Sequence, residues 1–335
     1  MKFPLYHRPS AIVFLDDETP YLEMLAMVLP QSWCIRFHTR VRDYLAEIRT
    51  QAEQWDADVA QHQTIINQWH IGKPLPGQIL NYWRTQRGRY GLPSIAVVDY
   101  AMPAANGLDV LKVSPPWPPY RVLLTGKADE HTAVAAFNEG LIDRFVTKQT
   151  PDLVQKLIHA LREHYSSPMD FHEGIWRNSL KRHQAQVLQD KTVQQAIRDW
   201  LQEQACVEYF ILPEPFGLLA LDINGFTHWL QFELRQHLGS AADLASAAGH
   251  DASTVASIAQ GKILSDAEWQ QSVGINNAPQ VAPTLAMGTD GHLIVAHFPQ
   301  KELGTAGLGY RTYLSSLPER GVDLDSCEAS DAAKS

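Results

Sequence analysis

Charged and hydroxyl side chains end several short apolar runs in the first half of the 335-residue chain. These runs are rich in β-branched residues and alternate with segments of helical spacing, which predicts a parallel sheet with helices on both faces. In such a sheet the carboxyl ends of the strands lie at one edge, where ligands bind. The residues that we expect at this edge are Asp16, Asp17, Asp99, Thr125 and Lys148.

This set of side chains has the composition of a phosphoryl-transfer site. Three carboxylates held close together repel one another, and Mg2+ is the hard cation that oxygen ligands of this kind prefer. An aspartate can serve as the nucleophile, while a lysine and a hydroxyl bind the phosphoryl oxygens. The alternative is that each acid only caps the helix that follows it, as aspartate often does at a strand-to-helix turn.

Five strands and four helices are needed to position these residues. The apolar runs predict strands over 11–15, 33–37, 94–98, 121–124 and 144–147. Helical spacing follows over 18–29, from 41 onward, over 128–138 and over 153–161. We therefore expect a doubly wound, five-stranded parallel α/β sheet.

Four short motifs occur in order at these strand ends. They are Asp16-Asp17, Asp99-Tyr-Ala-Met-Pro-Ala-Ala-Asn-Gly107, Thr125-Gly126 and Phe145-Val-Thr-Lys148. On these motifs, residues 10–165 resemble the receiver domain of two-component response regulators, which has a flavodoxin-like fold. The layout of the whole chain also weakly resembles quorum-sensing response regulators of the α-hydroxyketone type.

The resemblance implies a role for each edge residue. Asp99 is the implied phosphoacceptor, and a sensor histidine kinase or a phosphotransfer protein is the implied donor. Thr125 and Lys148 would bind the phosphate, and Thr125 with Phe145 would form the switch pair. The implied Mg2+ ligands are Asp16, Asp17, Asp99 and the backbone carbonyl of Ala101.

Two features depart from the resemblance. The family usually has proline directly after the lysine, whereas Pro151 comes three residues after Lys148. In addition, Asp17 and Asp99 are 82 positions apart, whereas two helices, two strands and four short loops require only about 50 residues, so roughly 30 extra residues lie within 51–93. This insertion continues the second helix and adds another at 79–87. It is either a dimerisation or partner-docking element, or a helix packed on its own receiver.

The second half of the chain predicts a different architecture. An Asn224-Gly225 turn between apolar runs indicates a β-hairpin, and a second hairpin follows over 284–298. We expect a receiver over 1–165, a linker and connecting helix over 166–206, an α+β output domain over 207–318 with about five antiparallel strands, and a disordered acidic tail over 319–335. The helical pattern over 173–204 is either a dimer seam or one or two ordinary helices.

The charge distribution helps to choose among output functions. Residues 1–167 carry 17 basic and 17 acidic residues, so the net charge of −9 belongs entirely to 168–335. Segment 240–262 resembles a repressor-type helix-turn-helix, with Ser253, Thr254 and Gln260 as possible DNA contacts. Its second helix has no Lys or Arg to clamp phosphates. The charge therefore favours a protein partner, with DNA binding as the alternative.

Other classes of function are not favoured. No motif of an enzymatic output is present in 168–335, so we expect no enzyme activity beyond phosphorylation of Asp99. Apolar runs are too short to span a membrane. Three widely spaced cysteines indicate reduced thiols in the cytoplasm.

Overall fold

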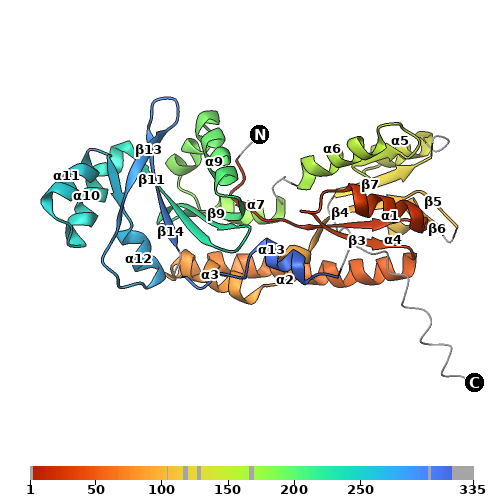
Figure 1. Cartoon of the computed structure of the whole chain (residues 1–335), viewed down its shortest axis with the longest axis horizontal. Helices are drawn as coiled ribbons and strands as arrows, with labels where there is room; N and C mark the ends of the chain where they lie inside the picture. The colour runs from red at the N-terminus through yellow and green to blue at the C-terminus, as the bar shows by residue number, and fades with distance from the viewer. Residues whose placement is uncertain are drawn as a thin grey trace, which may run out of the picture. The chain divides into compact units, whose positions relative to one another are not determined.

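The chain forms two compact units (Figure 1). The computed structural model describes residues 3–103, 105–115, 120–126, 130–165, 170–300 and 303–318. The expected acidic tail from 319 onward lies outside these residues. The parallel unit comprises Pro9–Asp58, Gly88–Ser167 and Leu314–Ser335, and the antiparallel unit comprises Met1–Arg8, Val59–Arg87 and Pro168–Tyr313.

The parallel unit contains the predicted five-stranded sheet, in the order β3-β2-β4-β7-β8 with every pair parallel. Its strands are β2 (Ala11–Leu15), β3 (Cys34–His38), β4 (Pro93–Asp99), β7 (Tyr120–Thr125) and β8 (Arg144–Thr147). Strands β2 and β4 are buried along their whole length, as expected for a sheet covered on both faces. The predicted flavodoxin-like α/β fold is confirmed.

Helices cover both faces of this sheet. Helices α1 (Thr19–Val28) and α6 (Leu153–Tyr165) share one apolar cluster with alternate strand residues such as Phe14 and Val97. The remaining helices, α2 (Val41–His70, by its first half), α4 (Gly107–Val113) and α5 (Glu130–Asn138), share the other cluster with Leu15 and Val98. The two-residue strands β5 (Ala101–Met102) and β6 (Ala105–Asn106) pair with each other, and a 3-10 turn, η1, spans Arg89–Gly91.

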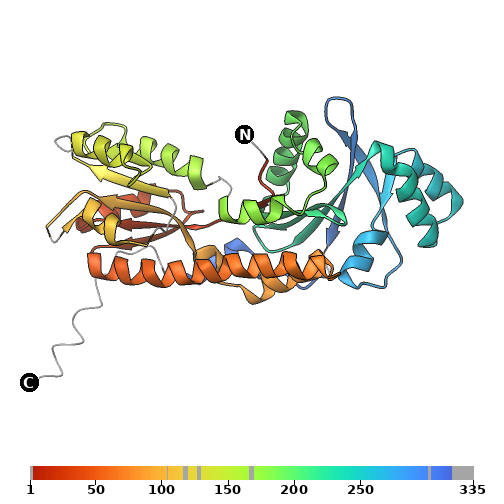
Figure 2. The same cartoon turned by 180° about the vertical axis from the view of Figure 1, so that it is seen from behind.

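The antiparallel unit is built on seven strands, in the order β1-β9-β10-β11-β14-β13-β12. Figure 2 shows its later strands in green to blue. About five were expected, and the additional ones are short. The strands are β1 (Tyr6–His7), β9 (Cys206–Pro213), β10 (Phe216–Asp222), β11 (Thr227–Leu234), β12 (Ile263–Ser265), β13 (Val281–Met287) and β14 (Leu293–Gln300). The predicted second domain with an antiparallel sheet is confirmed.

Three helices replace the expected connecting helix. They are α7 (Asp170–Arg177), α8 (Arg182–Val187) and α9 (Lys191–Glu203). Polar side chains lie at the end of α7 and at the start of α9: the Ser179 hydroxyl donates to the Trp176 carbonyl at 2.7 Å, and Asp190 caps α9 by accepting from the Thr192 amide at 2.8 Å. The segment 173–204 is thus divided among three helices, which does not agree with a single connecting helix and is one helix more than the alternative of one or two ordinary helices.

Other helices of this unit follow the strands. The helix pair expected at 240–248 and 252–260 is present as α10 (Leu238–Ala247) and α11 (Ala252–Ala259). The remaining helical elements are α3 (Leu75–Thr85), η3 (Arg235–His237), α12 (Ala267–Val273) and α13 (Tyr310–Ser316).

The second half of the insertion belongs to the antiparallel unit. Ile65 and Ile66 of α2, with Ile79 and Trp83 of α3, are buried in one apolar cluster with Phe210 of β9. The rings of Trp83 and Phe210 lie 6.0 Å apart. The interpretation that this helical segment packs on its own receiver is therefore wrong for residues 59–87, because its apolar face completes the other core.

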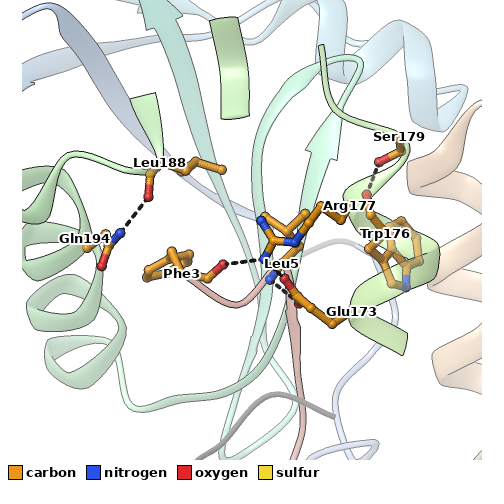
Figure 3. Close-up of polar contacts among 8 residues, drawn as sticks. All are labelled: Phe3, Leu5, Glu173, Trp176, Arg177, Ser179, Leu188 and Gln194. Carbon is orange, nitrogen blue, oxygen red and sulfur yellow. Dashed lines mark hydrogen bonds and ion pairs between the residues drawn. The ribbon is translucent and has the colours of Figure 1, made fainter. Parts of the chain in front are cut away.

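The first residues of the chain also belong to the antiparallel unit. Strand β1 pairs with β9, with Tyr6 opposite Phe210. Figure 3 shows how α7 holds this segment: the Leu5 amide donates to Glu173 Oε2 at 2.9 Å. Arg177 pairs with Glu173 and also donates to the Phe3 carbonyl at 3.4 Å. The units therefore divide the chain differently from the boundaries expected at 165 and 206.

Candidate functional site

Acidic side chains meet at the carboxyl edge of the parallel sheet. Asp99 is the last residue of β4, and Asp16 and Asp17 come directly after β2. Their carboxylate oxygens lie within 4.8 Å of one another. Asp16 and Asp99 are buried, and Asp17 is half-buried. The three acids that the sequence places at the ends of strands therefore lie together at one edge of the sheet.

Lys148 lies between two of these acids. It follows β8, and its Nζ is 2.7 Å from Asp16 Oδ2 and 2.8 Å from Asp99 Oδ1. Burial opposes the charge of this ammonium, but the hydrogen bonds to Asp16 and Asp99 outweigh it and raise the pKa of Lys148. The lysine is therefore a fixed cation at this edge.

One lysine does not neutralise the site. Burial raises the pKa of Asp16 to about 6, although Lys148 and the amide of Glu18, which donates to Asp16 Oδ1 at 3.0 Å, act in the opposite direction. Three carboxylates and one ammonium leave a formal charge of −2. This all-oxygen set with excess negative charge fits a hard divalent cation such as Mg2+.

Thr125 contributes a hydroxyl to the same edge. It is the last residue of β7 and is fully buried, and its carbonyl accepts from the Lys148 amide at 2.8 Å. Among the described residues, its Oγ1 has no hydrogen-bond partner. A buried hydroxyl without a partner is costly, so an oxygen atom of a ligand would satisfy it.

Phe145 lies one strand away from Thr125. It is half-buried on β8 and packs against the apolar cluster under α4 and α5. This half-buried position is compatible with the switch role that the sequence predicts.

The loop after β4 is shaped by two further residues of the motif. Asn106 caps α4 by accepting from the Leu108 amide at 2.8 Å. A Cβ at Gly107 would lie 2.1 Å from the Asp99 carbonyl oxygen, so only glycine permits this approach. The backbone at Ala101 is in β5, paired with Asn106, and Ala104 lies outside the described residues.

Tyr21 is a neighbour of this site that the sequence did not single out. Lys148 Nζ lies 4.7 Å from the centroid of its ring, within the range of a cation–π interaction. Burial, followed by the charges of Asp16 and Asp99, raises the pKa of its hydroxyl. The signal was its place in the first turn of the helix after Asp16-Asp17.

The residues predicted as DNA contacts lie on α11 or directly after it, in the other unit. Asp251 accepts from the Ser253 amide at 2.8 Å and from the Thr254 hydroxyl at 3.0 Å. Gln260 follows the end of α11. Two of the three residues are thus engaged at the acidic cap of the helix, and DNA contact through them stays a prediction.

The sheet order and the edge residues define a class of protein: the chain has the fold of a response-regulator receiver joined to a second domain. A response regulator of Legionella pneumophila, LqsR, has a similar structure, with a TM-score of 0.68 and 23% identity over 97% of this chain and 100% of that chain. At this identity the similarity shows the fold alone.

Other solved structures overlap less. An adenylate cyclase structure from Rhodopirellula baltica is 22% identical over 47% of this chain and 90% of its own, with a TM-score of 0.31. A receiver-domain protein from Clostridium thermocellum is 16% identical over 47% and 94%, with a TM-score of 0.30. No protein-family profile and no curated protein sequence matches the chain.

In the part of the chain that the structure describes, no helix is both long and apolar enough to cross a membrane.

Proposed function

We propose that this protein is a response regulator whose receiver accepts a phosphoryl group on Asp99 from a histidine kinase or a phosphotransfer protein. The observation that carries the proposal is the position of Lys148 between Asp16 and Asp99, at 2.7 and 2.8 Å, beside a third carboxylate. A salt bridge that only stabilised the fold would not require a third acid at the same point.

The proposed reaction is a phosphoryl transfer between two side chains. A carboxylate oxygen of Asp99 forms a bond to the phosphorus of a phosphohistidine, and the P–N bond breaks. The electron pair of that bond stays on the leaving imidazole, which takes a proton from solvent. Lys148 already contacts Asp99 and is placed to pair with the charge that moves onto the phosphoryl oxygens.

Asp16, Asp17, Asp99 and the backbone carbonyl of Ala101 would hold Mg2+. The metal supplies charge compensation for the phosphoryl oxygens. The three carboxylates are within 4.8 Å of one another, and the raised pKa of Asp16 indicates that its negative charge lacks full compensation from the protein alone.

Thr125 and Phe145 would convert phosphorylation into a change of surface. The buried Thr125 hydroxyl has no partner among the described residues and would donate to a phosphoryl oxygen. Its movement would leave space for the half-buried Phe145 ring on the neighbouring strand. We propose that the antiparallel unit reads this change and acts through a cytoplasmic protein partner, since residues 168–335 carry the whole net charge of −9.

Labelling with radioactive acetyl phosphate tests the proposal. The wild-type chain should be labelled in the presence of Mg2+ and not in the presence of EDTA. Asp99→Asn should reduce labelling at least 100-fold, because an amide oxygen is a far weaker nucleophile than a carboxylate.

The matched control is Asp109→Asn, which removes one negative charge from the exposed surface of α4. It should be labelled like the wild type. Undiminished labelling of Asp99→Asn would overturn the assignment.

A further inference from the structure

A cavity of about 300 Å3 lies in the antiparallel unit where β10 begins. The last register pair of β10 with β11 is Gly217–Gln231, so β11 continues through Leu234 beside β14 alone. Residues from α8, the β9–β10 turn, η3 and α12 surround this extension of β11. The volume is in the range of sites that bind small molecules.

The floor of the cavity carries an unused acceptor. Gln231 lines it and is 94% buried, with a relative exposure of 6%. Its Oε1 has no hydrogen-bond partner in the described part of the chain. The atom is itself shielded from solvent, and a buried carbonyl without a donor is destabilising. A turn of this side chain toward the cavity would offer the carbonyl to an N–H or O–H group of a ligand.

Carboxylates dominate the charge around this acceptor. Glu233 is two residues further along β11, on the same face as Gln231, and is half-buried. Glu214 and Glu268 are exposed at the mouth. The lysine of the cavity, Lys181, is engaged at the mouth by Glu214 at 2.5 Å.

Glu233 therefore has little built-in compensation. The nearest ring nitrogen of His237 is 4.0 Å from Glu233 Oε1, which is too long for a hydrogen bond. Burial, and secondarily the charge of Glu268, raises the pKa of Glu233 to about 7. A cation bound beside Glu233 would remove this penalty.

The side chains do not converge as metal ligands. Among the described residues, no group with three carboxylate, imidazole or thiolate ligand atoms within 4.8 Å of one another includes Glu233 or Glu268. Phe216 and Phe232 also line the cavity, but they lie on the other face of the sheet from Gln231 and Glu233. Spread acids and a carbonyl acceptor suit a larger, hydrogen-bonding cation.

We propose that this cavity binds a small organic cation with N–H donors, a guanidinium or primary ammonium group, through Gln231 and Glu233. Such a group donates to the Gln231 carbonyl and to the Glu233 carboxylate at the same time. The proposal concerns the antiparallel unit and stands independently of phosphorylation at Asp99.

Calorimetric titration of the full chain at pH 8 with n-butylguanidinium tests it. The control ligand is n-butylurea, which has the same shape and no charge. We expect the guanidinium to bind at least ten-fold more tightly than the urea. Equal affinity, or no heat from either ligand, would overturn the proposal.

Variants localise the binding. Glu233→Gln should weaken n-butylguanidinium binding about ten-fold or more, because it removes a charge-assisted hydrogen bond. Glu203→Gln is the matched control, since Glu203 is exposed at the end of α9, is no part of this cavity and changes the net charge equally. Equal weakening by both variants would show only a general charge effect and would refute the site.

A pH series on the wild type gives a test that needs no variant. The groups that face Glu233 are Glu214, Glu268, Lys181, His183 and His237. A cation binds the ionised form of Glu233, so affinity should fall as the pH decreases from 8 to 6, and binding at pH 7 should release a proton. Affinity that is constant over this range would contradict the proposal.

Two sources could supply the cation. A capped Gly-Arg-Gly peptide presents the same guanidinium as a protein side chain does. Tighter binding of n-butylguanidinium than of the peptide supports a free small molecule, and the reverse supports an arginine of a protein partner.

Discussion

The two units treat a cluster of acids in different ways. At the edge of the parallel sheet, a lysine is fixed within 2.8 Å of two aspartates. In the cavity of the antiparallel unit, Lys181 instead pairs with Glu214 at the mouth, and Glu233 on the floor has a pKa raised to about 7. An ammonium thus compensates the acids in one unit, whereas in the other unit burial raises the pKa of the acid instead.

The comparison also shows how far one lysine can compensate a buried acid. The pKa of Asp16 is still raised to about 6, although Lys148 Nζ is 2.7 Å away. Burial of an ion is unfavourable by several kcal/mol, and one ion pair restores only part of that. Both sites therefore have capacity for an added positive charge, and they differ in the size of cation that fits.

The largest effect on stability is expected from Lys148→Met. This variant would leave the acids at the edge of the parallel sheet without a paired lysine, like Glu233 in the cavity. It leaves Asp16 and Asp99 without their cation, so the free energy of unfolding at pH 7.5 should fall by about 3 kcal/mol. At pH 4 the loss should be smaller, because Asp16, whose pKa is raised to about 6, is then largely protonated. Urea denaturation at the two pH values measures this.

The exposed Lys156 on α6 provides the control. Lys156→Met should change stability by less than about 0.5 kcal/mol. A similar loss in the two variants would mean that Lys148 compensates nothing.

Gly107→Ala should have the next largest effect. The added Cβ would lie 2.1 Å from the Asp99 carbonyl oxygen, so the loop after β4 must move, at about 2 kcal/mol of stability. Phosphorylation by acetyl phosphate should fall as well. At Gly88 a Cβ meets nothing within 4 Å, and Gly88→Ala should retain both stability and labelling.

Asp16→Asn should increase stability at neutral pH by about 1.5 kcal/mol while abolishing Mg2+-dependent labelling. The folded pKa of about 6 is above the ordinary aspartate value of 3.8, so the folded state binds more protons than the unfolded state between these values. Stability therefore falls as the pH rises through this window, and the asparagine removes that fall. Thermal unfolding at pH 4 and 7.5 tests the sign; a variant less stable than the wild type at pH 7.5 would disprove it.

The smallest effect is expected for Asn106→Ala. Loss of the hydrogen bond from the Leu108 amide should destabilise the parallel unit by about 1 kcal/mol. Asn138 is exposed at the end of α5, and alanine there should be neutral. Urea midpoints of the two variants would coincide if the cap had no role.

The sequence predicts the edge site better than it predicts the domains. Strands such as Ala11–Leu15 are apolar throughout. Parallel strands bring the residues that follow them to one edge of the sheet, independently of the length and sequence of the loops. An apolar helix face, by contrast, does not say which core it joins. Ile65 and Ile79 were correctly read as helical, but their burial against Phe210 depends on contacts about 130 to 145 residues away in sequence.

Other misses have similar physical causes. The helical pattern over 173–204 does not reveal that the segment is interrupted. The interruptions depend on local hydrogen bonds of Ser179 and Asp190, which the spacing of apolar residues does not detect. Gln231 and Glu233 appear in sequence as the alternating polar residues of a half-exposed strand. Only the early end of β10 leaves a cavity beside them.

The assembly of the antiparallel unit from distant segments has a consequence for synthesis and for truncation. Strand β9 emerges from the ribosome about 200 residues after β1, its sheet partner. Strand β1 therefore has no sheet partner during synthesis until β9 is made, and the residues of the parallel sheet are synthesised between the two strands. A recombinant fragment starting at residue 168 would lack β1 and α3, and would expose the edge of β9 together with the apolar surface around Phe210. We expect such a fragment to aggregate, so the full-length chain is the appropriate material for binding assays on this unit.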